Sequence, residues 1–228
     1  MKKQQKPKNW HEIKANDSWA LFKIMSEFVE GYETLARIGP CISVFGSART
    51  EEGHPHYEMA VEVAEKIVES GYGVITGGGP GLMEAANRGA KNAGGISVGL
   101  NIDLPFEQFP NPYIDNDKLI NFQYFFVRKV IFVKYAQGFI VMPGGFGTLD
   151  ELFEAITLIQ THKVSRFPIV LVGKSFWGGL MDWIQNTLLS EGYISDEDMF
   201  LFELVDTPAE AVEKINHFYT TENFRPNF

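Results

Sequence analysis

One nine-residue segment joins a glycine-rich turn to a carboxylate, a combination that can hold a phosphate beside a reacting bond. It runs from Pro143 to Glu151 and reads PGGFGTLDE. Glycine lets an anion approach backbone N–H groups closely, and the positive end of a helix keeps a nearby carboxylate ionised. An ionised Glu151 would stabilise a cation developing at C1 of a ribose. The alternative is structural, because Thr148 and Glu151 also have the spacing of a capping box.

A second pair of charged residues, Arg128 and Lys129, lies between the apolar runs 125–127 and 130–133. Charged groups among aromatic side chains are costly to bury unless they are paired or serve a site. The alternative is two basic residues that extend from a helix start into solvent. Because adjacent helical positions diverge by about 100°, both side chains would reach one atom only from an irregular helix start.

The chain has 22 glycines, and the most informative of them gather in three segments, each after a predicted strand. The segments are Gly46 with Ser47, the run from Gly77 to Gly81 that contains Gly78 and Gly79, and the run Gly144, Gly145 and Gly147 with Thr148. Ligands of open α/β sheets bind at the carboxyl ends of the strands, so we expect one phosphate-binding edge. Glycines that only make tight turns are the alternative.

Two common nucleotide motifs do not match. Residues 77–82, GGGPGL, depart from G-x-G-x-x-G in every register, which argues against NAD and an oxidoreductase. Gly173-Lys174-Ser175 resembles the end of a P-loop, but Pro168 stands where the motif requires glycine. A mononucleotide or a phosphosugar remains as the predicted ligand class.

Short apolar runs alternate with helical patterns along the chain. We expect strands at 41–45, 73–76, 96–100, 139–142 and 169–172, an extended segment at 122–126, and helices at 57–68, 82–93, 127–136, 148–160, 176–189 and 208–219. Residues 101–121 are predicted to form a long loop. Parallel strands need crossover connections. The predicted class is therefore α/β, a single doubly wound Rossmann-like domain with helices on both faces of a parallel sheet.

The predicted domain spans residues 17–228, and residues 1–16 are predicted to be a flexible N-terminal arm. Asp17 and Ser18 are the expected caps of a first helix, which ends before Gly39-Pro40.

Composition narrows the class of protein. The 20 basic and 29 acidic residues give a net charge of −9, which argues against a general nucleic-acid binder. No run approaches the roughly 18 apolar residues of a membrane helix, and the lone Cys41 fits a reducing cytoplasm. His54 and His56 lack partner ligands at metal spacing, and His162 is expected at a helix end. We therefore predict a cytoplasmic protein with no metal, no cofactor and no membrane partner.

The chain resembles a known family. Residues 143–151 match the PGGxGTxxE signature of the LOG family, and residues 76–87, TGGGPGLMEAAN, resemble its other glycine loop. The family consists of cytokinin-activating nucleoside 5′-monophosphate phosphoribohydrolases, long mislabelled as lysine decarboxylases. The resemblance covers about residues 40 to 190, and residues 104–108, LPFEQ, look like the bacterial longer-chain subgroup.

The resemblance implies hydrolysis of the N-glycosidic bond of AMP or an N6-modified AMP, with release of the base and ribose 5-phosphate. Arg128 and Glu151 would be the catalytic pair. The substrate-binding residues would be Gly46, Ser47, Gly78, Gly79, Glu84, Glu107, Lys129, Gly144, Gly145, Gly147, Thr148 and Thr157. Asp150 stands where many relatives have glutamate. Nothing in the chain resembles a pyridoxal-phosphate lysine site, so we reject the decarboxylase label.

Family members are at least dimers, so we expect a homodimer or a higher homo-oligomer. Apolar positions on the N-terminal helix and the aromatic stretch 122–132 would suit an interface or a core equally. The competing functional hypothesis is a nucleotide-binding or carrier module on the same fold, which holds its ligand without turnover.

Overall fold

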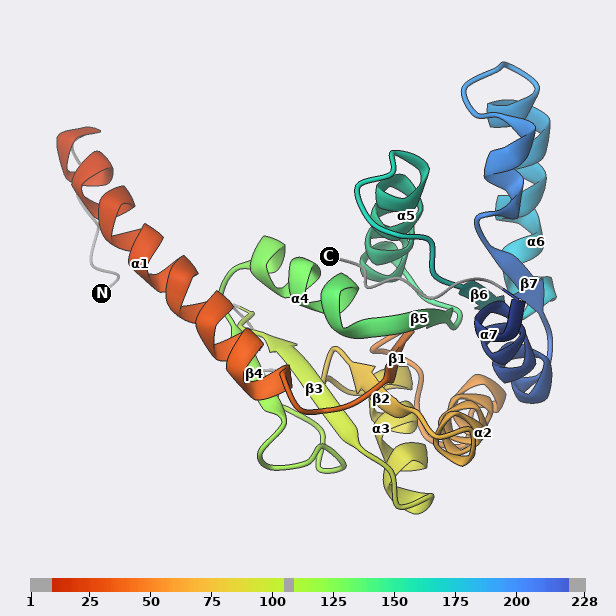
Figure 1. Cartoon of the computed structure of the whole chain (residues 1–228), viewed down its shortest axis with the longest axis horizontal. Helices are drawn as coiled ribbons and strands as arrows, with labels where there is room; N and C mark the ends of the chain where they lie inside the picture. Colours follow the sequence, from red (N-terminus) through yellow and green to blue (C-terminus); the bar gives the residue numbers. More distant parts are fainter. Residues whose placement is uncertain (1–9, 105–108, 222–228) are drawn as a thin grey trace, which may run out of the picture.

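The computed structural model describes residues 10–104 and 109–221, and its centre is one parallel sheet of seven strands (Figure 1). The strands are β1 (Cys41–Phe45), β2 (Gly73–Thr76), β3 (Ser97–Ile102), β4 (Leu119–Phe122), β5 (Ala136–Val141), β6 (Ile169–Val172) and β7 (Glu203–Val205). Their order in the sheet is β4-β3-β2-β1-β5-β6-β7, and every neighbouring pair is parallel. This confirms the predicted α/β class with a doubly wound sheet.

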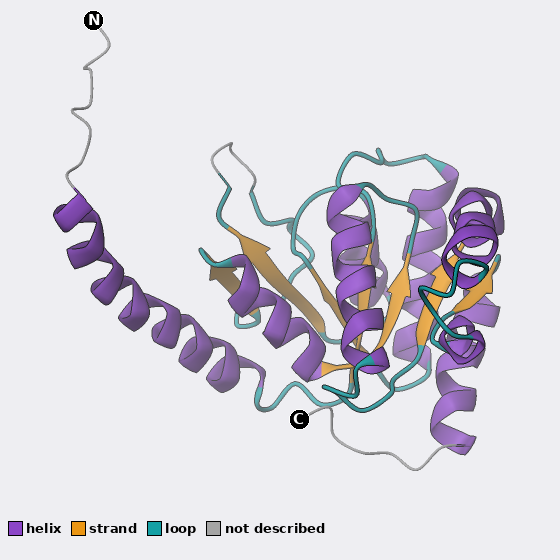
Figure 2. Cartoon of the chain, turned by 90° about the horizontal axis from the view of Figure 1, so that it is seen from above, coloured by secondary structure: helices purple, strands orange, loops and turns teal. Residues whose placement is uncertain are grey.

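Helices cover both faces of the sheet, as Figure 2 shows from above. One apolar cluster joins the sheet to α1 (Trp10–Leu35), α4 (Phe125–Tyr135), α5 (Phe146–Gln160) and α6 (Lys174–Trp183). The other joins it to α2 (Pro55–Glu69), α3 (Leu82–Asn92) and α7 (Pro208–Thr221). A π-helical segment (Ile184–Leu189) continues α6, and a 3-10 segment (Asp196–Phe200) precedes β7. The strands are buried on both faces, which explains why they read as short, continuous apolar runs.

The strand order creates a switch point beside β1. From β1 the chain proceeds to β2, β3 and β4 on one side, and then crosses to β5 on the other side of β1. The loops that leave β1 and β5 therefore diverge at the carboxyl edge of the sheet. That crevice is where open α/β sheets bind their ligands.

Several predicted boundaries were wrong. The first helix begins at Trp10 rather than at Asp17, so residues 10–16 are helical and the predicted flexible arm was too long; residues 1–9 lie outside the described part. The segment 10–16 contains neither glycine nor proline, so nothing in it interrupts a helix. Strands β4 and β7 were missed, because they lie at the edges of the sheet, are only partly buried and therefore lack a continuous apolar run.

In the described ranges, no helix combines the length and the apolar character needed to cross a membrane. The long helix α1 instead carries charged residues along its length and projects beyond the sheet (Figure 1).

Helices α2 and α3 approach so closely that one position excludes any side chain. A Cβ atom on Gly89 of α3 would lie 2.2 Å from the carbonyl oxygen of Val61 and 2.8 Å from the Cβ atom of Ala64. Backbone atoms of a packed helix cannot move aside cheaply. Gly89 thus fixes the spacing of the two helices, one of which begins directly after the second glycine loop.

We predict that Gly89→Ala lowers the free energy of unfolding by about 1–3 kcal/mol, the usual cost of overpacking a core. Gly179→Ala in α6 is the matched control, because a Cβ atom there meets nothing within 4 Å. That variant should be neutral or slightly stabilising, since alanine favours a helix over glycine by up to about 1 kcal/mol. Urea unfolding measures the free energy of unfolding of both variants and of the wild-type protein. Equal effects at the two positions would contradict the packing account.

Candidate functional site

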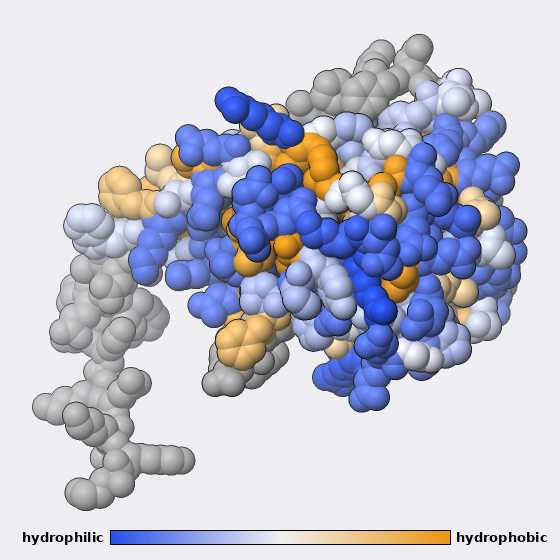
Figure 3. Space-filling model, turned by 90° about the horizontal axis from the view of Figure 1, so that it is seen from below, coloured by the Kyte–Doolittle hydropathy of each residue, from blue (hydrophilic) through white to orange (hydrophobic). Residues whose placement is uncertain are grey.

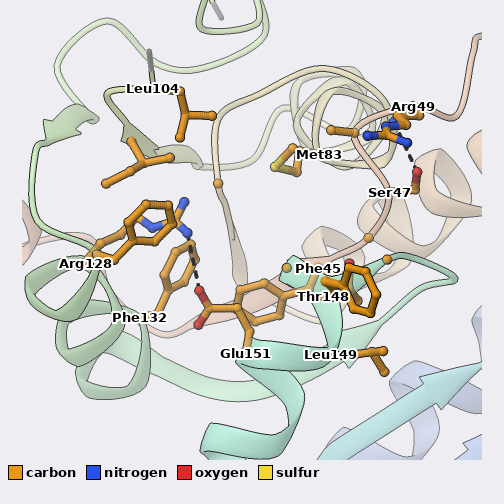
Figure 4. A pocket seen from close by; sticks show the side chains of 18 residues that line it. Phe45, Ser47, Arg49, Met83, Leu104, Arg128, Phe132, Thr148, Leu149 and Glu151 are labelled. Carbon is orange, nitrogen blue, oxygen red and sulfur yellow. Dashed lines mark hydrogen bonds and ion pairs between the residues drawn. The ribbon is translucent and has the colours of Figure 1, made fainter. Parts of the chain in front are cut away.

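A cavity of about 700 Å³ opens at the switch point (Figure 4). The loop after β1, the start of α5 and the first turn of α4 form its walls. The described residues that line it are Phe45, Gly46, Ser47, Ala48, Arg49, Gly77, Met83, Ile102, Leu104, Phe125, Arg128, Phe132, Gly145, Phe146, Gly147, Thr148, Leu149 and Glu151. The sequence therefore brings two of the three glycine segments, and one residue of the third, to a single space.

The loops after β1 and β5 contact each other through backbone atoms. The N–H of Ser47 donates a hydrogen bond to the carbonyl of Pro143 at 3.1 Å. A Cβ atom on Gly144 would lie 2.1 Å from Oγ1 of Thr148 and 3.1 Å from the nitrogen of Ser47. Gly144 does not line the cavity itself, but its missing side chain lets Thr148 and the β1 loop close one end of it.

Helix α5 starts without a side-chain cap. Its first residue is Phe146 and its N-cap is Gly145. Glycine has no side chain that could accept a hydrogen bond from the N–H groups of the first turn. Gly145, Phe146, Gly147 and Thr148 all line the cavity. The capping-box interpretation was wrong, because Thr148 is the third residue of the helix and Glu151 pairs with another helix. The positive end of α5 faces the cavity and suits an anion.

The middle glycine segment approaches the cavity through Gly77 alone. Gly81 has a φ of +69°, and a Cβ atom there would lie 2.4 Å from the carbonyl oxygen of Ser47, so only glycine fits this contact. The N–H of Leu82 also donates to that carbonyl at 2.9 Å. Gly78 and Gly79, predicted to bind substrate, do not line the cavity.

A buried polar network holds this segment in place. Nδ2 of Asn111 donates to the carbonyl oxygens of Gly78 and Gly79 at 3.1 and 3.0 Å, and to Oδ1 of Asn87 at 2.9 Å. Asn87 in turn accepts from the hydroxyl of Thr76 and donates to Oγ of Ser97. Buried amides are stable only when their partners are supplied, so the network fixes the loop rather than leaving it free to move.

Arg128 and Glu151 meet across the cavity wall, from α4 and α5 respectively (Figure 4). Nη2 of Arg128 lies 3.3 Å from Oε1 of Glu151, and the two side chains are only 12% and 7% exposed. The guanidinium lies over the rings of Phe125 and Phe132, at 5.3 and 5.6 Å from their centroids. Its Nε is buried and has no hydrogen-bond partner among the described residues.

Burial controls the charge state of this pair. Desolvation raises the pKa of Glu151 from its ordinary value of 4.5 to about 7, against the opposing charges of Arg128 and Lys129. Desolvation also lowers the pKa of Arg128, although an arginine remains charged at neutral pH. Burial thus acts against the expectation that the helix end keeps Glu151 ionised. The carboxylate lies in the second turn of α5 and is buried, so the helix end cannot keep it ionised.

Lys129 turns away from the cavity, as expected for a residue adjacent to Arg128 on a regular helix. Its Nζ lies 2.8 Å from Asp150 and 3.0 Å from Glu154 on α5. Lys129, predicted to bind substrate, therefore does not line the cavity. Its two ion pairs instead join α4 to α5 beside the Arg128–Glu151 contact.

Three other predicted residues are not brought to the cavity. Glu84 accepts a hydrogen bond from the hydroxyl of Tyr57 at 3.3 Å and does not line the cavity. Thr157 is exposed, and its hydroxyl donates to the carbonyl of Phe153, because it lies about 240° around α5 from Glu151. Glu107 lies outside the described residues.

The histidines stay apart from the cavity. Nδ1 of His54 accepts the N–H of His56 at the start of α2, and His162 follows α5 with a φ of +56°. Within the described residues, no group of three or more histidine, cysteine or acidic side chains is placed to hold a metal ion.

The sequence did not predict the apolar side chains of the cavity or one arginine that lines it. Met83, Ile102, Leu104 and Phe125 line the cavity, and so does Arg49 in the loop after β1. The apolar residues carry no signal of their own, because the same residue types fill the core. Arg49 directly follows Gly46-Ser47-Ala48, so its place in a glycine loop was the available clue.

The sequence matches one protein family and is similar to several named proteins. The model of a family described as "Possible lysine decarboxylase" matches residues 83–215. A cytokinin riboside 5′-monophosphate phosphoribohydrolase of Mycobacterium tuberculosis is 37% identical over 162 residues, which cover 68% of this chain and 82% of that protein. The rice (Oryza sativa subsp. japonica) enzyme of the same name, LOG, is 28% identical over 177 residues, covering 76% and 71%.

Solved structures share the fold. The molybdenum cofactor binding protein of Rippkaea orientalis superposes with a TM-score of 0.56 at 25% identity, covering 78% of this chain and 96% of that one. The Moco carrier protein of Chlamydomonas reinhardtii gives a TM-score of 0.55 at 25% identity, covering 80% and 99%. Taken with the family match over more than half of the chain, these findings confirm the resemblance drawn from the glycine motifs: the chain belongs to the LOG family, whose sequence model bears the decarboxylase description.

Proposed function

We propose that this protein is a hydrolase that cleaves the N-glycosidic bond of a nucleoside 5′-monophosphate, AMP or an N6-modified AMP, into the free base and ribose 5-phosphate. The observation that carries the proposal is the buried Arg128–Glu151 pair beside the uncapped start of α5. The names of the Mycobacterium tuberculosis and rice relatives support the same reaction.

The cavity offers each part of such a substrate a matching surface. The uncapped start of α5 presents backbone N–H groups, which suit the phosphate. Arg49 lines this end, and no carboxylate in the described ranges pairs with its guanidinium. Met83, Ile102, Leu104 and Phe125 form an apolar wall that suits the flat face of a base. The ribose would then lie between them, next to Glu151.

The reaction replaces the C1′–N bond by a C1′–O bond from water. The bonding electrons leave with the base, and positive charge develops at C1′. Ionised Glu151 stabilises that charge and accepts a proton from the attacking water. The departing base takes up a proton from the solvent, and Glu151 then releases its own proton to the solvent. Arg128 holds the carboxylate through the 3.3 Å contact. A carboxylate with a pKa of about 7 is well matched to accept and release a proton near neutral pH.

The residues do not fit lysine decarboxylation by a lysine-bound cofactor. Among the described residues that line the cavity there is no lysine. The nearest one in sequence to the catalytic pair, Lys129, is engaged by Asp150 and Glu154. An amine held by two carboxylates stays protonated and is a poor nucleophile.

A second candidate is a carrier that binds a phosphate-bearing ligand without turnover. The solved structures of molybdenum cofactor binding and carrier proteins favour it, since their chains superpose on most of this one. One experiment distinguishes the hydrolase from the carrier. After long incubation with AMP, a hydrolase yields free adenine, whereas a carrier returns the ligand intact.

We also propose that the protein forms a homodimer or a higher homo-oligomer. Helix α1 exposes Leu21, Phe22, Met25 and Val29, and α4 exposes Phe125 and Phe126 nearby. Figure 3 shows apolar atoms along the arm that α1 forms. The N-terminal helix therefore presents an apolar surface that suits a subunit interface, whereas Phe122 and Phe132 of the aromatic stretch belong to the core. Sizing by light scattering tests this proposal.

The proposed location is the cytoplasm. The single cysteine, Cys41, is fully buried, and burial raises the pKa of its thiol to about 12. A buried, protonated thiol stays reduced and takes part in no disulfide within this chain. Such cysteine usage is typical of a reducing compartment.

We predict that Glu151→Gln lowers kcat for AMP hydrolysis by about 100-fold or more, because the variant keeps the shape but cannot carry charge or accept a proton. Glu58→Gln, which removes the same charge from an exposed position of α2 outside the cavity, is the control and should stay within about threefold of wild type. Chromatographic detection of adenine measures both. Full activity in Glu151→Gln would refute the proposed role.

We predict that kcat/KM for AMP rises with pH through about 7, because only ionised Glu151 is active and burial raises its pKa in the ligand-free protein to that value. The second ionisation of a phosphate lies near pH 6, so binding of AMP is measured separately across the same range. A kcat/KM that, once corrected for this binding, stays constant between about pH 5.5 and 8.5, or falls with rising pH, would contradict this assignment.

We predict that Arg49→Ala weakens binding of ribose 5-phosphate and AMP by about tenfold but leaves adenosine binding unchanged, since a charge-assisted hydrogen bond to phosphate is worth about 1.5–3 kcal/mol. Arg37→Ala is the control, because Arg37 is exposed at the end of α1, outside the cavity. Calorimetry gives the affinities. An equal loss for AMP and adenosine would rule out a phosphate contact.

A further inference from the structure

Helix α1 precedes the segment matched by the family model, yet it lies against the helix that carries Arg128 (Figure 1). Near the middle of the contact, a Cβ atom on Gly31 would lie 2.9 Å from Cδ1 of Ile131. At the far end, the hydroxyl of Tyr135 donates to the carbonyl of Tyr32 at 3.3 Å. The two helices therefore touch along most of α4.

The third contact lies at the start of α4 and consists of two hydrogen bonds from backbone N–H groups to a carboxylate. Glu27 of α1 is 8% exposed. One oxygen of its carboxylate accepts the N–H of Gln123 at 2.9 Å, and the other accepts the N–H of Tyr124 at 3.3 Å. Tyr124 is the N-cap of α4, and no side chain of its own region caps the helix. Glu27 thus accepts from α1 the N–H of the N-cap residue, as the glutamate of a capping box does from within its own helix.

The charge of Glu27 matters at this position. No cationic side chain in the described ranges forms an ion pair with it, so the carboxylate is stabilised by the two N–H groups and the positive end of α4. A buried carboxylate without such partners would be costly. The contact therefore fixes the position of the first turn of α4 relative to α1.

Arg128 is in that first turn. It is the fourth residue of α4, and its N–H donates to the carbonyl of Tyr124 at 3.3 Å. A shift of the helix start would move the guanidinium relative to Glu151, which it meets at only 3.3 Å. We propose that Glu27 is a positioning residue for the proposed reaction, and that through the start of α4 it holds Arg128 against Glu151. This inference rests on the proposed function.

The test compares Glu27→Gln with Glu30→Gln. The first variant keeps the length of the side chain but places an amide donor where a carboxylate oxygen faces an N–H. The second removes the same charge from an exposed position of α1. We expect Glu27→Gln to lower kcat about tenfold with KM within about twofold, because an amide cannot accept both N–H groups as the carboxylate does, and the loss misplaces a group that acts in the transition state. Glu30→Gln should match wild type in both parameters.

The pH profile separates positioning from a loss of stability. Arg128 and Lys129 from α4 lower the pKa of Glu151, while Asp150 and Glu154 on its own helix raise it. If Arg128 moves away, the pKa of Glu151 rises, so the acidic limb of the kcat profile moves to higher pH in Glu27→Gln. A variant that is only less stable keeps the wild-type limb. An unshifted limb, or a kcat equal to that of Glu30→Gln, would overturn the proposal.

Hydrogen exchange gives a readout that needs no turnover. In Glu27→Gln the amides of Gln123 and Tyr124 should exchange at least tenfold faster, with no change in α3. If the wild-type protein cleaves no nucleotide, the proposed function fails, and the exchange rates still report on the cap. Unchanged exchange at these two amides would overturn the inference even if the protein is an active hydrolase.

Discussion

The site depends on keeping one carboxylate out of water beside one guanidinium. Burial raises the pKa of Glu151 to about 7, and the charge of Arg128 compensates only part of that effect. A pair at 3.3 Å tolerates little displacement, so the helices that carry it must be fixed. Glu27 fixes the start of α4, the Lys129 ion pairs join α4 to α5, and Gly144 lets α5 begin against the loop after β1.

The positive groups proposed to bind phosphate are local, although the molecule as a whole is acidic. The chain has a net charge of −9, yet the proposed phosphate end presents the N–H groups at the start of α5 together with Arg49. Backbone dipoles bind an anion without adding net charge. Met83, Ile102, Leu104 and Phe125 line the same cavity, so one space offers a polar and an apolar surface to a ligand that has both. This division is what the proposed substrate class requires.

The sequence predicted the sheet, the glycine loops and the two charged residues of the pair, because each leaves a local signal. Short apolar runs mark buried parallel strands, and PGGFGTLDE marks a turn before a helix. It did not predict that Gly78 and Gly79 are held away from the cavity by Asn111, since that contact spans about thirty residues. Nor did it predict the ionisation of Glu151, because burial depends on how α4 packs against α5. The proposed role of Glu27 likewise left no signal in the sequence, because Glu27 is one glutamate among several on a helix that carries charged residues along its length.

The most direct test of the account is a titration of Glu151 itself. With ¹³C-labelled glutamate, the carboxylate resonance that is absent from Glu151→Gln can be followed by NMR from about pH 4 to 9. The account predicts an apparent pKa near 7 for this carboxylate in the ligand-free protein. A midpoint close to the ordinary value of 4.5 would show that the carboxylate is solvated and fully ionised at neutral pH, and would contradict the central claim.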